Sequence, residues 1–362
     1  MMPRLLLNFI CKNEAQNIGR MLASAEPWIV GCVCTDTGST DATPLMIEAF
    51  FRAHNKPCVI THEPFIDYAQ ARNAALRAAR ASGIEHDYLL LLDCDHELVM
   101  QEGGLIELSA MAYNLVQASK EMRFTNVRLL RSDATVEYVG RTHEALIMPE
   151  GEPLWNLSDD VMWVRDHETG SNRPEKYTRD MELLERDYAD DPNNPRTVFY
   201  IAQTLRGGGR FQESREWSDK RIAMEPRNEE TWWTLLSKAQ CGEMLELDCA
   251  TVSYDYLTAF LFMPARVESM YFLGAYHRRR GEHELAILYS RAAALTPHLS
   301  STYLTDPNVS EWLALDDWLG MAIILGMGAD ARHAAKLLSK RKLPDSERER
   351  IEHNIKLVEQ LS

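Results

Sequence analysis

Two carboxylates that are one residue apart, Asp93 and Asp95, follow directly after the uninterrupted apolar run 88–92. Neighbouring carboxylates disfavour each other's charged form unless a cation or hydrogen bonds compensate them. Their oxygens suit Mg²⁺ or Mn²⁺, which usually bind one or two carboxylates together with substrate phosphates. The triplet Asp93-Cys94-Asp95 therefore predicts a divalent cation that bridges the protein and a diphosphate. A plain acidic turn at the surface is the alternative.

A further carboxylate, Asp36, follows the apolar run 29–35 and precedes a glycine turn with a helix-capping residue at 38–41. Open α/β sheets bind ligands beyond the carboxyl ends of their strands. We therefore expect Asp36 at the same sheet edge as Asp93 and Asp95. There it can accept a hydrogen bond from a base or a ribose while the phosphates are left to the metal. A turn and a cap alone would not explain this position.

The elements that must position these side chains alternate between short apolar runs and amphipathic segments, which is typical of an α/β sheet domain. The expected strands are 5–11, 29–35, 58–61 and 88–92, and the expected helices are 14–24, 43–53 and 69–81. The run 88–92 lacks polar alternation, so we expect it to be central and covered on both faces. The stretch 123–148 is expected to be rich in strands.

The second half of the chain repeats at the spacing of helical hairpins. Prolines stand at Pro192, Pro226, Pro264 and Pro297, at intervals of 34, 38 and 33 residues. A period of about 34 residues is that of tetratricopeptide repeats. We expect a sheet domain over residues 1–175 and a helical repeat domain over residues 176–362. A helical array without repeats is the alternative.

The charge balance restricts the class of partner. The chain of 362 residues has 39 Lys and Arg against 54 Asp and Glu, a formal net charge of −15. Such a surface repels phosphate backbones over most of its area, which argues against a general nucleic-acid binder. A local basic cleft remains open at Lys176 and Arg179, or at residues 278–280.

Cysteines and apolar runs bear on the compartment. The seven cysteines are scattered without a CxxC pair, which fits a reducing environment. No apolar run reaches membrane length, and the run 5–10 is too short for a signal peptide. We therefore expect a soluble, cytoplasmic protein with no membrane span.

Four segments, taken in order, resemble the motifs of family 2 glycosyltransferases. They are Lys12-Asn13-Glu14 with Asn17-Ile18, residues 36–41, residues 65–73 and Asp93-Cys94-Asp95. That family has the GT-A fold, a Rossmann-like sheet that binds nucleotide-sugars. The resemblance implies an α/β GT-A domain followed by an all-α tetratricopeptide-like domain.

The resemblance also implies roles for single residues. Asp36 would contact the nucleobase, Arg72 would help to hold the nucleotide, and Glu14 is placed with them as a donor-binding residue. Asp95 would ligate the metal ion, Mn²⁺ or Mg²⁺. Asp93 would contact the ribose, a metal-bound water or the metal itself.

Two later segments resemble a bacterial branch of the same family. Residues 138–144 match its Gly-x-x-His-Glu segment, and residues 164–170 match its His-x-x-Gly stretch before helical repeats. Similar enzymes complete the metal site with the late histidine, so His167 is the expected third ligand. Neutral imidazole suits Mn²⁺, although it is softer than Mg²⁺ prefers. An ordinary polar histidine near the surface is the alternative.

Transfer with inversion needs a base that takes the proton of the attacking acceptor. Many family members use an acidic pair after the metal motif, and this chain has no such pair at the expected place. Glu144 is the best candidate, with His143 beside it as an orienting group or a substitute base. Alternatively, both contact substrate hydroxyls.

Together these expectations describe a metal-dependent glycosyltransferase of the hexosyltransferase type, with a UDP-sugar as the donor that the resemblance favours. Repeats often present a concave surface to peptides, so the acceptor is a peptide, a protein or a glycan, and the repeats could also form a homodimer. One alternative is a sugar nucleotidyltransferase, which would need a glycine-rich loop that residues 11–18 lack. Another is a non-catalytic adaptor with a vestigial first domain.

Overall fold

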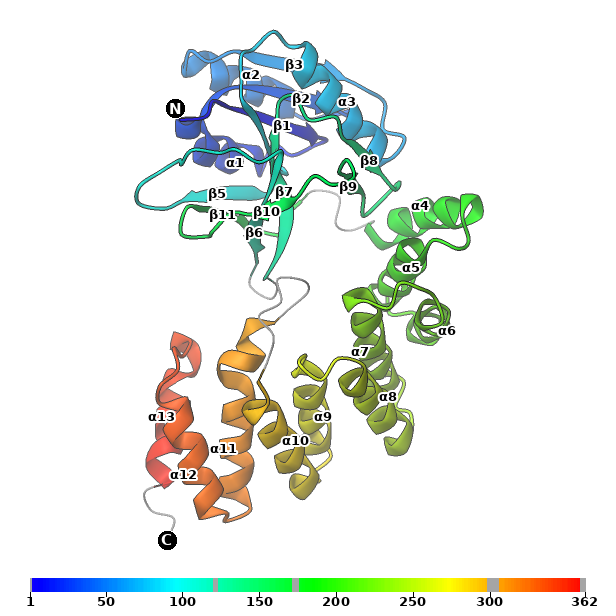
Figure 1. The fold of residues 1–362 in the computed structure, drawn as a ribbon, viewed down its shortest axis with the longest axis vertical. Coiled ribbons are helices and arrows are strands. Elements are labelled where there is room, and N and C mark those ends of the chain that lie inside the picture. Colours follow the sequence, from blue (N-terminus) through cyan, green and yellow to red (C-terminus); the bar gives the residue numbers. More distant parts are fainter. Residues whose placement is uncertain (1, 120–122, 171–175, 298–305, 359–362) are drawn as a thin grey trace. The chain divides into compact units, whose positions relative to one another are not determined.

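The computed structural model describes residues 2–119, 123–170, 176–297 and 306–358 (Figure 1). The chain divides into two compact units, Met1–Tyr200 and Ile201–Ser362. The domain boundary expected after residue 175 falls on residues 171–175, which lie outside the described residues, and it stays a prediction.

A nine-stranded mixed sheet forms the centre of the first unit in the described residues. Its strand order is β3-β2-β1-β4-β7-β6-β11-β5, with β10 paired to β6. The strands are β1 (Leu5–Cys11), β2 (Ile29–Asp36), β3 (Cys58–His62), β4 (Tyr88–Leu91), β5 (His96–Met100), β6 (Ala112–Ala118), β7 (Arg123–Arg131), β10 (Leu154–Asn156) and β11 (Met162–Asp166). The strands β1 to β4 run parallel, whereas β7 pairs antiparallel with both β4 and β6.

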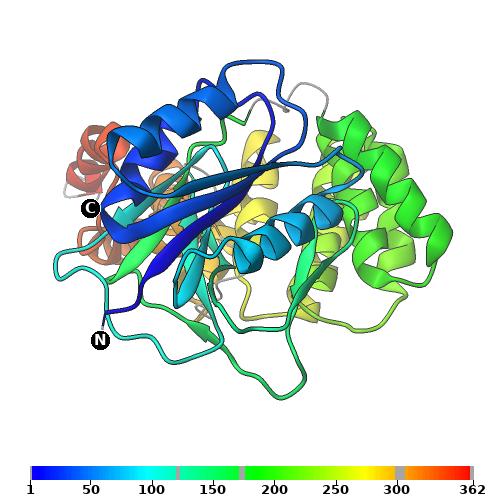
Figure 2. The same cartoon turned by 90° about the horizontal axis from the view of Figure 1, so that it is seen from above.

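Helices cover both faces of the parallel strands because alternate residues of β1 point to opposite sides. Leu5 and Leu7 pack with α1 (Ile18–Ala25) and α2 (Thr43–Ala53), whereas Leu6 packs with α3 (Tyr68–Ala81). Figure 2 shows α3 on the opposite side of the sheet from α1 and α2.

The expected strands are confirmed, and β4 lies inside the sheet between β1 and β7 with all four residues buried. One helix begins later than predicted. It starts at Ile18 and not at residue 14, because Asn13 has a positive φ of 57° and the residues that follow it form a turn. The stretch after residue 123 forms β7 and a short hairpin of β8 (Glu137–Val139) and β9 (Ala145–Ile147).

The remainder of the chain is helical. The helices are α4 (Lys176–Asp190), α5 (Pro195–Gly207), α6 (Phe211–Ile222), α7 (Glu229–Met244), α8 (Cys249–Phe262), α9 (Glu268–Arg279), α10 (His283–Leu295), α11 (Ala314–Ile324), α12 (Gly328–Leu338) and α13 (Asp345–Val358). Pro192, Pro226 and Pro264 lie in the loops before α5, α7 and α9, and Pro297 follows α10. The predicted period therefore corresponds to helical hairpins.

Small residues allow the hairpin helices to approach closely. A Cβ on Gly274 of α9 would lie 3.1 Å from the backbone nitrogen of Ser290 and 3.3 Å from the carbonyl oxygen of Ala286, both on α10. Trp232, Tyr256 and Leu273 bury their side chains between α7, α8 and α9. The expected fold class, a GT-A-like α/β domain followed by an all-α tetratricopeptide-like domain, is confirmed. In the described part of the chain, the helices are too short or too polar to cross a membrane.

Candidate active site

The carboxyl ends of the parallel strands meet at one edge of the sheet. β2 ends at Asp36, and β4, on the other side of β1, leads into the acidic triplet. A pocket of about 370 Å³ lies at this edge. Among the predicted residues, it is lined by Glu14, Arg72, Asp93 and Asp95. The structure thus brings these four predicted side chains to one cavity.

Asp95 is a carboxylate in an environment that disfavours its charge. Its Oδ2 accepts a hydrogen bond from the backbone N–H of Gly170 at 2.9 Å. Burial, followed by the charges of Asp93 and Asp166, raises the pKa of Asp95 to about 6. A cation at this position would relieve the repulsion between the carboxylates.

Asp166, which was not predicted from the sequence, is a further carboxylate close to Asp95. Oxygens of Asp95 and Asp166 and a ring nitrogen of His96 all lie within 4.8 Å of one another. The ring of His96 is held by protein partners on both nitrogens: Nδ1 accepts the backbone N–H of Asp93 at 3.0 Å, and Nε2 lies 3.3 Å from Nε2 of Gln117. The two carboxylates of the group fit Mg²⁺ or Mn²⁺, which take other ligands from phosphates and water.

His167 lies close to this group, but its ring points to another partner. Its backbone N–H donates to the carbonyl oxygen of Asp95 at 3.3 Å, whereas its Nε2 lies 2.7 Å from Oε2 of Glu97. Its role as a third metal ligand stays a prediction. Sequence reasoning missed Asp166, which directly precedes His167, because only the antiparallel pairing of β11 with β5 brings it next to the triplet.

Asp93 differs from Asp95 because arginines compensate its charge. Arg72 Nη2 donates to Oδ1 at 2.8 Å, and Arg128 Nη2 donates to Oδ2 at 3.2 Å. Burial disfavours the charged carboxylate, but the two guanidinium groups outweigh it and hold the pKa of Asp93 well below its usual range. Arg128 was not predicted from the sequence. The only indication in the sequence was an arginine inside the partly apolar segment that forms β7.

Glu144 shares Arg72 with Asp93. The Nε of Arg72 donates to Oε1 of Glu144, whose side chain is 12% exposed. Arg72 therefore links the end of β4 to the loop between β8 and β9. Its pKa is raised well above the usual value because the charges of Asp93 and Glu144 outweigh the effect of burial.

His143, next to Glu144, contacts other partners. Its ring stacks on Tyr200 with centroids 4.0 Å apart, and its Nε2 lies 3.9 Å from Oδ2 of the buried Asp180. Its carbonyl oxygen accepts from Nη2 of Arg196 at 3.1 Å. Burial, followed by nearby cations led by Lys176, lowers the pKa of His143 to about 3. The imidazole is therefore neutral at ordinary pH and a weak proton acceptor.

Asp36 and Glu14 are both held by the protein itself. Asp36 is 3% exposed; its two oxygens lie 3.1 and 3.2 Å from the backbone N–H of Ser39, and the thiol of Cys11 donates to Oδ1 at 3.7 Å. Glu14 Oε2 accepts from Asn17 Nδ2 at 2.8 Å, and the same amide donates to the carbonyl oxygen of Thr169 at 2.9 Å. Cys11 lines the pocket, whereas Asp36 is not among the lining residues.

Two cations from α4 complete the lining of the pocket. Lys176 and Arg179 lie on its wall, at the first of the two positions where the sequence left a basic cleft open. Arg179 also stacks over the ring of Tyr68, 5.2 Å from its centroid. The pocket thus combines carboxylates on one side with a lysine and an arginine, the residue types that bind phosphate oxygens.

Comparison with known proteins agrees with the resemblance seen in the sequence. The model of glycosyl transferase family 2 matches residues 9–101, a range that includes Asp36, Arg72, Asp93 and Asp95. Residues 9–101 are therefore similar to family 2 glycosyl transferases, and a tetratricopeptide-like helical domain follows them. His143, Glu144 and His167 lie beyond the matched range.

The other comparisons concern the whole chain or its helices. A protein named TPR repeat-containing protein from Synechococcus elongatus is 25% identical over 322 residues, which cover 80% of this chain and 74% of that protein. A crystal structure of MamA covers 53% of this chain and 96% of its own, with 14% identity and a TM-score of 0.35. A thermophilic TPR protein from Thermus thermophilus covers 50% of this chain and 92% of its own, with 16% identity and a TM-score of 0.33.

Proposed function

We propose that the protein is a metal-dependent glycosyltransferase that moves a sugar from a nucleotide-sugar, a UDP-sugar in the first place, to a peptide, protein or glycan acceptor. The observation that carries the proposal is the contrast between the two carboxylates of the triplet. Asp93 is neutralised by Arg72 and Arg128, whereas Asp95 is crowded by further carboxylates at a pocket that also contains cations. Such a site is suited to a metal-bound diphosphate.

Different residues are proposed to bind different parts of the nucleotide-sugar donor. Asp95 and Asp166 would hold Mn²⁺ or Mg²⁺, which stabilises the negative charge that develops on the leaving diphosphate. Lys176 and Arg179 are placed on the pocket wall to bind phosphate oxygens. Asp36, on the neighbouring strand end, is assigned to the nucleoside. Glu14 accepts from Asn17, which itself donates to the carbonyl oxygen of Thr169, next to the Gly170 N–H that binds Asp95.

Glu144 is the proposed base. As the acceptor attacks the anomeric carbon from the face opposite the diphosphate, the bond to the diphosphate breaks and the configuration inverts. Glu144 takes the acceptor's proton. Arg72 fixes the orientation of this carboxylate relative to Asp93. Of its two predicted roles, His143 fits the orienting one, because its lowered pKa makes it a poor base.

The helical unit is proposed to bind the acceptor or a second copy of the chain. Consecutive helical hairpins form extended surfaces that commonly bind peptides. The seven cysteines are all free, which supports the proposed cytoplasmic location.

The proposal is tested by titrating UDP calorimetrically into the full chain with and without Mn²⁺. Mn²⁺ should tighten UDP binding in the wild type, and Asp95→Ala should lose about tenfold or more of that gain. Asp133→Asn, a change at an exposed carboxylate paired with Arg131, is the matched control. If UDP affinity changes neither with Mn²⁺ nor with Asp95→Ala, the result would instead favour a non-catalytic adaptor. Release of UDP or GDP from a panel of donors without acceptor then names the nucleotide.

A further inference from the structure

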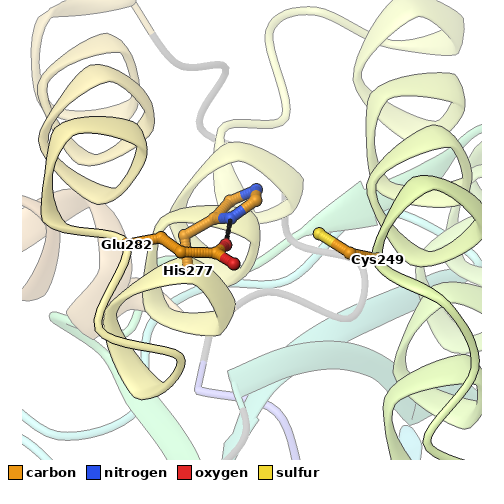
Figure 3. Close-up of side chains that lie close together, drawn as sticks. All are labelled: Cys249, His277 and Glu282. Carbon is orange, nitrogen blue, oxygen red and sulfur yellow. Dashed lines mark hydrogen bonds and ion pairs between the residues drawn. The ribbon is translucent and has the colours of Figure 1, made fainter.

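A separate group of metal-binding side chain types lies within the helical unit (Figure 3). Cys249 is the first residue of α8, His277 lies in the last turn of α9, and Glu282 directly precedes α10. The start of α8, the end of α9 and the start of α10 therefore meet at one place. A sulfur, a ring nitrogen and a carboxylate oxygen of these residues all lie within 4.8 Å of one another.

The histidine is fixed at the centre of this group. Its Nδ1 lies 2.6 Å from Oε2 of Glu282, as the dashed line in Figure 3 shows, and its Nε2 lies 3.4 Å from Oγ of Ser253. The ring of Tyr289 stacks on it at 5.4 Å. His277 is only 2% exposed, so its orientation is set by packing and not by solvent.

The carboxylate of Glu282 and the thiol of Cys249 both lie close to this ring. Glu282 Oε1 accepts from Nε of Arg280 at 3.0 Å, which leaves Oε2 for the imidazole or for an ion. The thiol of Cys249 lies 3.8 Å from Oγ of Ser253, and its sulfur is within 4.8 Å of both the carboxylate oxygen and the ring nitrogen. The thiol of Cys249 thus adds a soft ligand to an imidazole that already has a carboxylate partner.

We propose that Cys249, His277 and Glu282 bind a zinc-type transition metal ion that joins α8 to the α9–α10 hairpin. Thiolate, imidazole and carboxylate are the three ligand types of protein-bound Zn²⁺, and three such ligands with a water complete a tetrahedron. Zn–S and Zn–N bonds of about 2.3 and 2.0 Å place ligand atoms roughly 3.5 Å apart. The ion takes the place of the proton between His277 and Glu282, and the thiol loses its proton to solvent.

A catalytic thiol is the rival for the same three residues. In that arrangement, the thiol would donate directly to the imidazole, and a pocket would give a substrate access. The thiol is instead next to Ser253, and the imidazole is buried. The observations therefore favour an ion that stabilises the hairpin packing over a nucleophile.

The test uses the full chain and Co²⁺ as the spectroscopic probe for Zn²⁺. Binding at this site should give a thiolate-to-Co²⁺ charge-transfer band that Zn²⁺ removes by displacement. Cys249→Ser should abolish the band, and Glu282→Gln should weaken Co²⁺ binding about tenfold or more. Two control variants should keep the charge-transfer band. Cys241→Ser changes a buried cysteine of the same unit, whose thiol bonds Ser214, and Cys94→Ser changes the cysteine beside the proposed donor-site metal.

A second measurement covers the case in which a variant folds poorly. Zn²⁺ should raise the Tm of the wild type in proportion to the logarithm of its concentration, and Cys249→Ser should lose this response while its circular dichroism stays native. A wild-type protein without the thiolate band would overturn the proposal. So would a band that survives Cys249→Ser, or one that Cys94→Ser removes.

Discussion

Arg128 donates a hydrogen bond from Nη2 to Oδ2 of Asp93 at 3.2 Å, so a guanidinium group from an antiparallel strand neutralises a carboxylate at the end of a parallel one. Arg128 is 5% exposed and also donates to Gln117 Oε1 at 2.6 Å. Arg128→Met should therefore cost about 2–3 kcal/mol in the free energy of unfolding, because it leaves the partly buried carboxylate with one arginine fewer. Urea denaturation measures the loss. Arg131→Met, at an exposed ion pair of the same strand, should leave the midpoint nearly unchanged.

Removing the charge of Asp95 should stabilise the metal-free protein, whereas removing Arg128 destabilises it. Its raised pKa means that the fold disfavours its charge: the stability provided by the protonated form is present below about pH 4 and lost as the pH rises through about 6. At pH 7.5, in a buffer with a chelator that removes metal ions, Asp95→Asn should therefore raise the free energy of unfolding by about 1–2 kcal/mol. It should at the same time abolish stabilisation by Mn²⁺ with UDP. A metal-free Asp95→Asn protein that is less stable than the wild type would contradict this assignment.

The lowered pKa of His143 predicts that the free energy of unfolding falls in mild acid. Its pKa of about 3 lies below the unfolded value of about 6.5, so between these values the unfolded chain binds a proton that the folded protein excludes. Stability should be complete above pH 6.5 and should fall as the pH drops below it. Between pH 7 and pH 5, the wild type should lose about 2 kcal/mol more than His143→Gln. Equal losses in parallel urea titrations would mean that His143 is protonated in the folded protein.

Glu144 is tested by separating binding from turnover. Glu144→Gln keeps an oxygen that can accept from Nε of Arg72 but removes the proton acceptor. We expect kcat to fall about 10²- to 10⁴-fold with UDP affinity unchanged. His143→Gln should lower kcat far less, since its role is to orient the loop. Turnover that survives Glu144→Gln would mean that another residue is the base.

Two glycines of the helical unit form a matched pair. A Cβ on Gly274 would lie 3.1 Å from Ser290 N, whereas a Cβ on Gly320 of α11 would meet nothing within 4 Å. Gly274→Ala should therefore lower the free energy of unfolding by about 1–3 kcal/mol through overpacking. Gly320→Ala should raise it by about 0.5–1 kcal/mol, because alanine favours the helix. Thermal unfolding of both variants checks the difference in sign.

The sequence predicted the parts of the site that local pattern determines. Asp36, Asp93 and Asp95 each follow an apolar run, and parallel strands necessarily end at a common edge. Asp166 and Arg128 escaped prediction because their positions depend on the antiparallel pairings of β11 with β5 and of β7 with β4. No local periodicity encodes such long-range registers. The orientation of the His167 ring likewise depends on Glu97, a neighbour across the same antiparallel pair.

The loop that carries Glu144 determines where the chain can be divided. His143 is held by Tyr200 and Arg196, and the backbone N–H of Arg141 donates to Asp187 at 2.9 Å, so the supports of the loop belong to α4 and α5. A fragment cut after residue 175 would keep the sheet and lose these supports. Chimaeras that exchange the helical unit should therefore place their junction beyond Tyr200. The smallest fragment that keeps this loop supported is longer than the sheet itself.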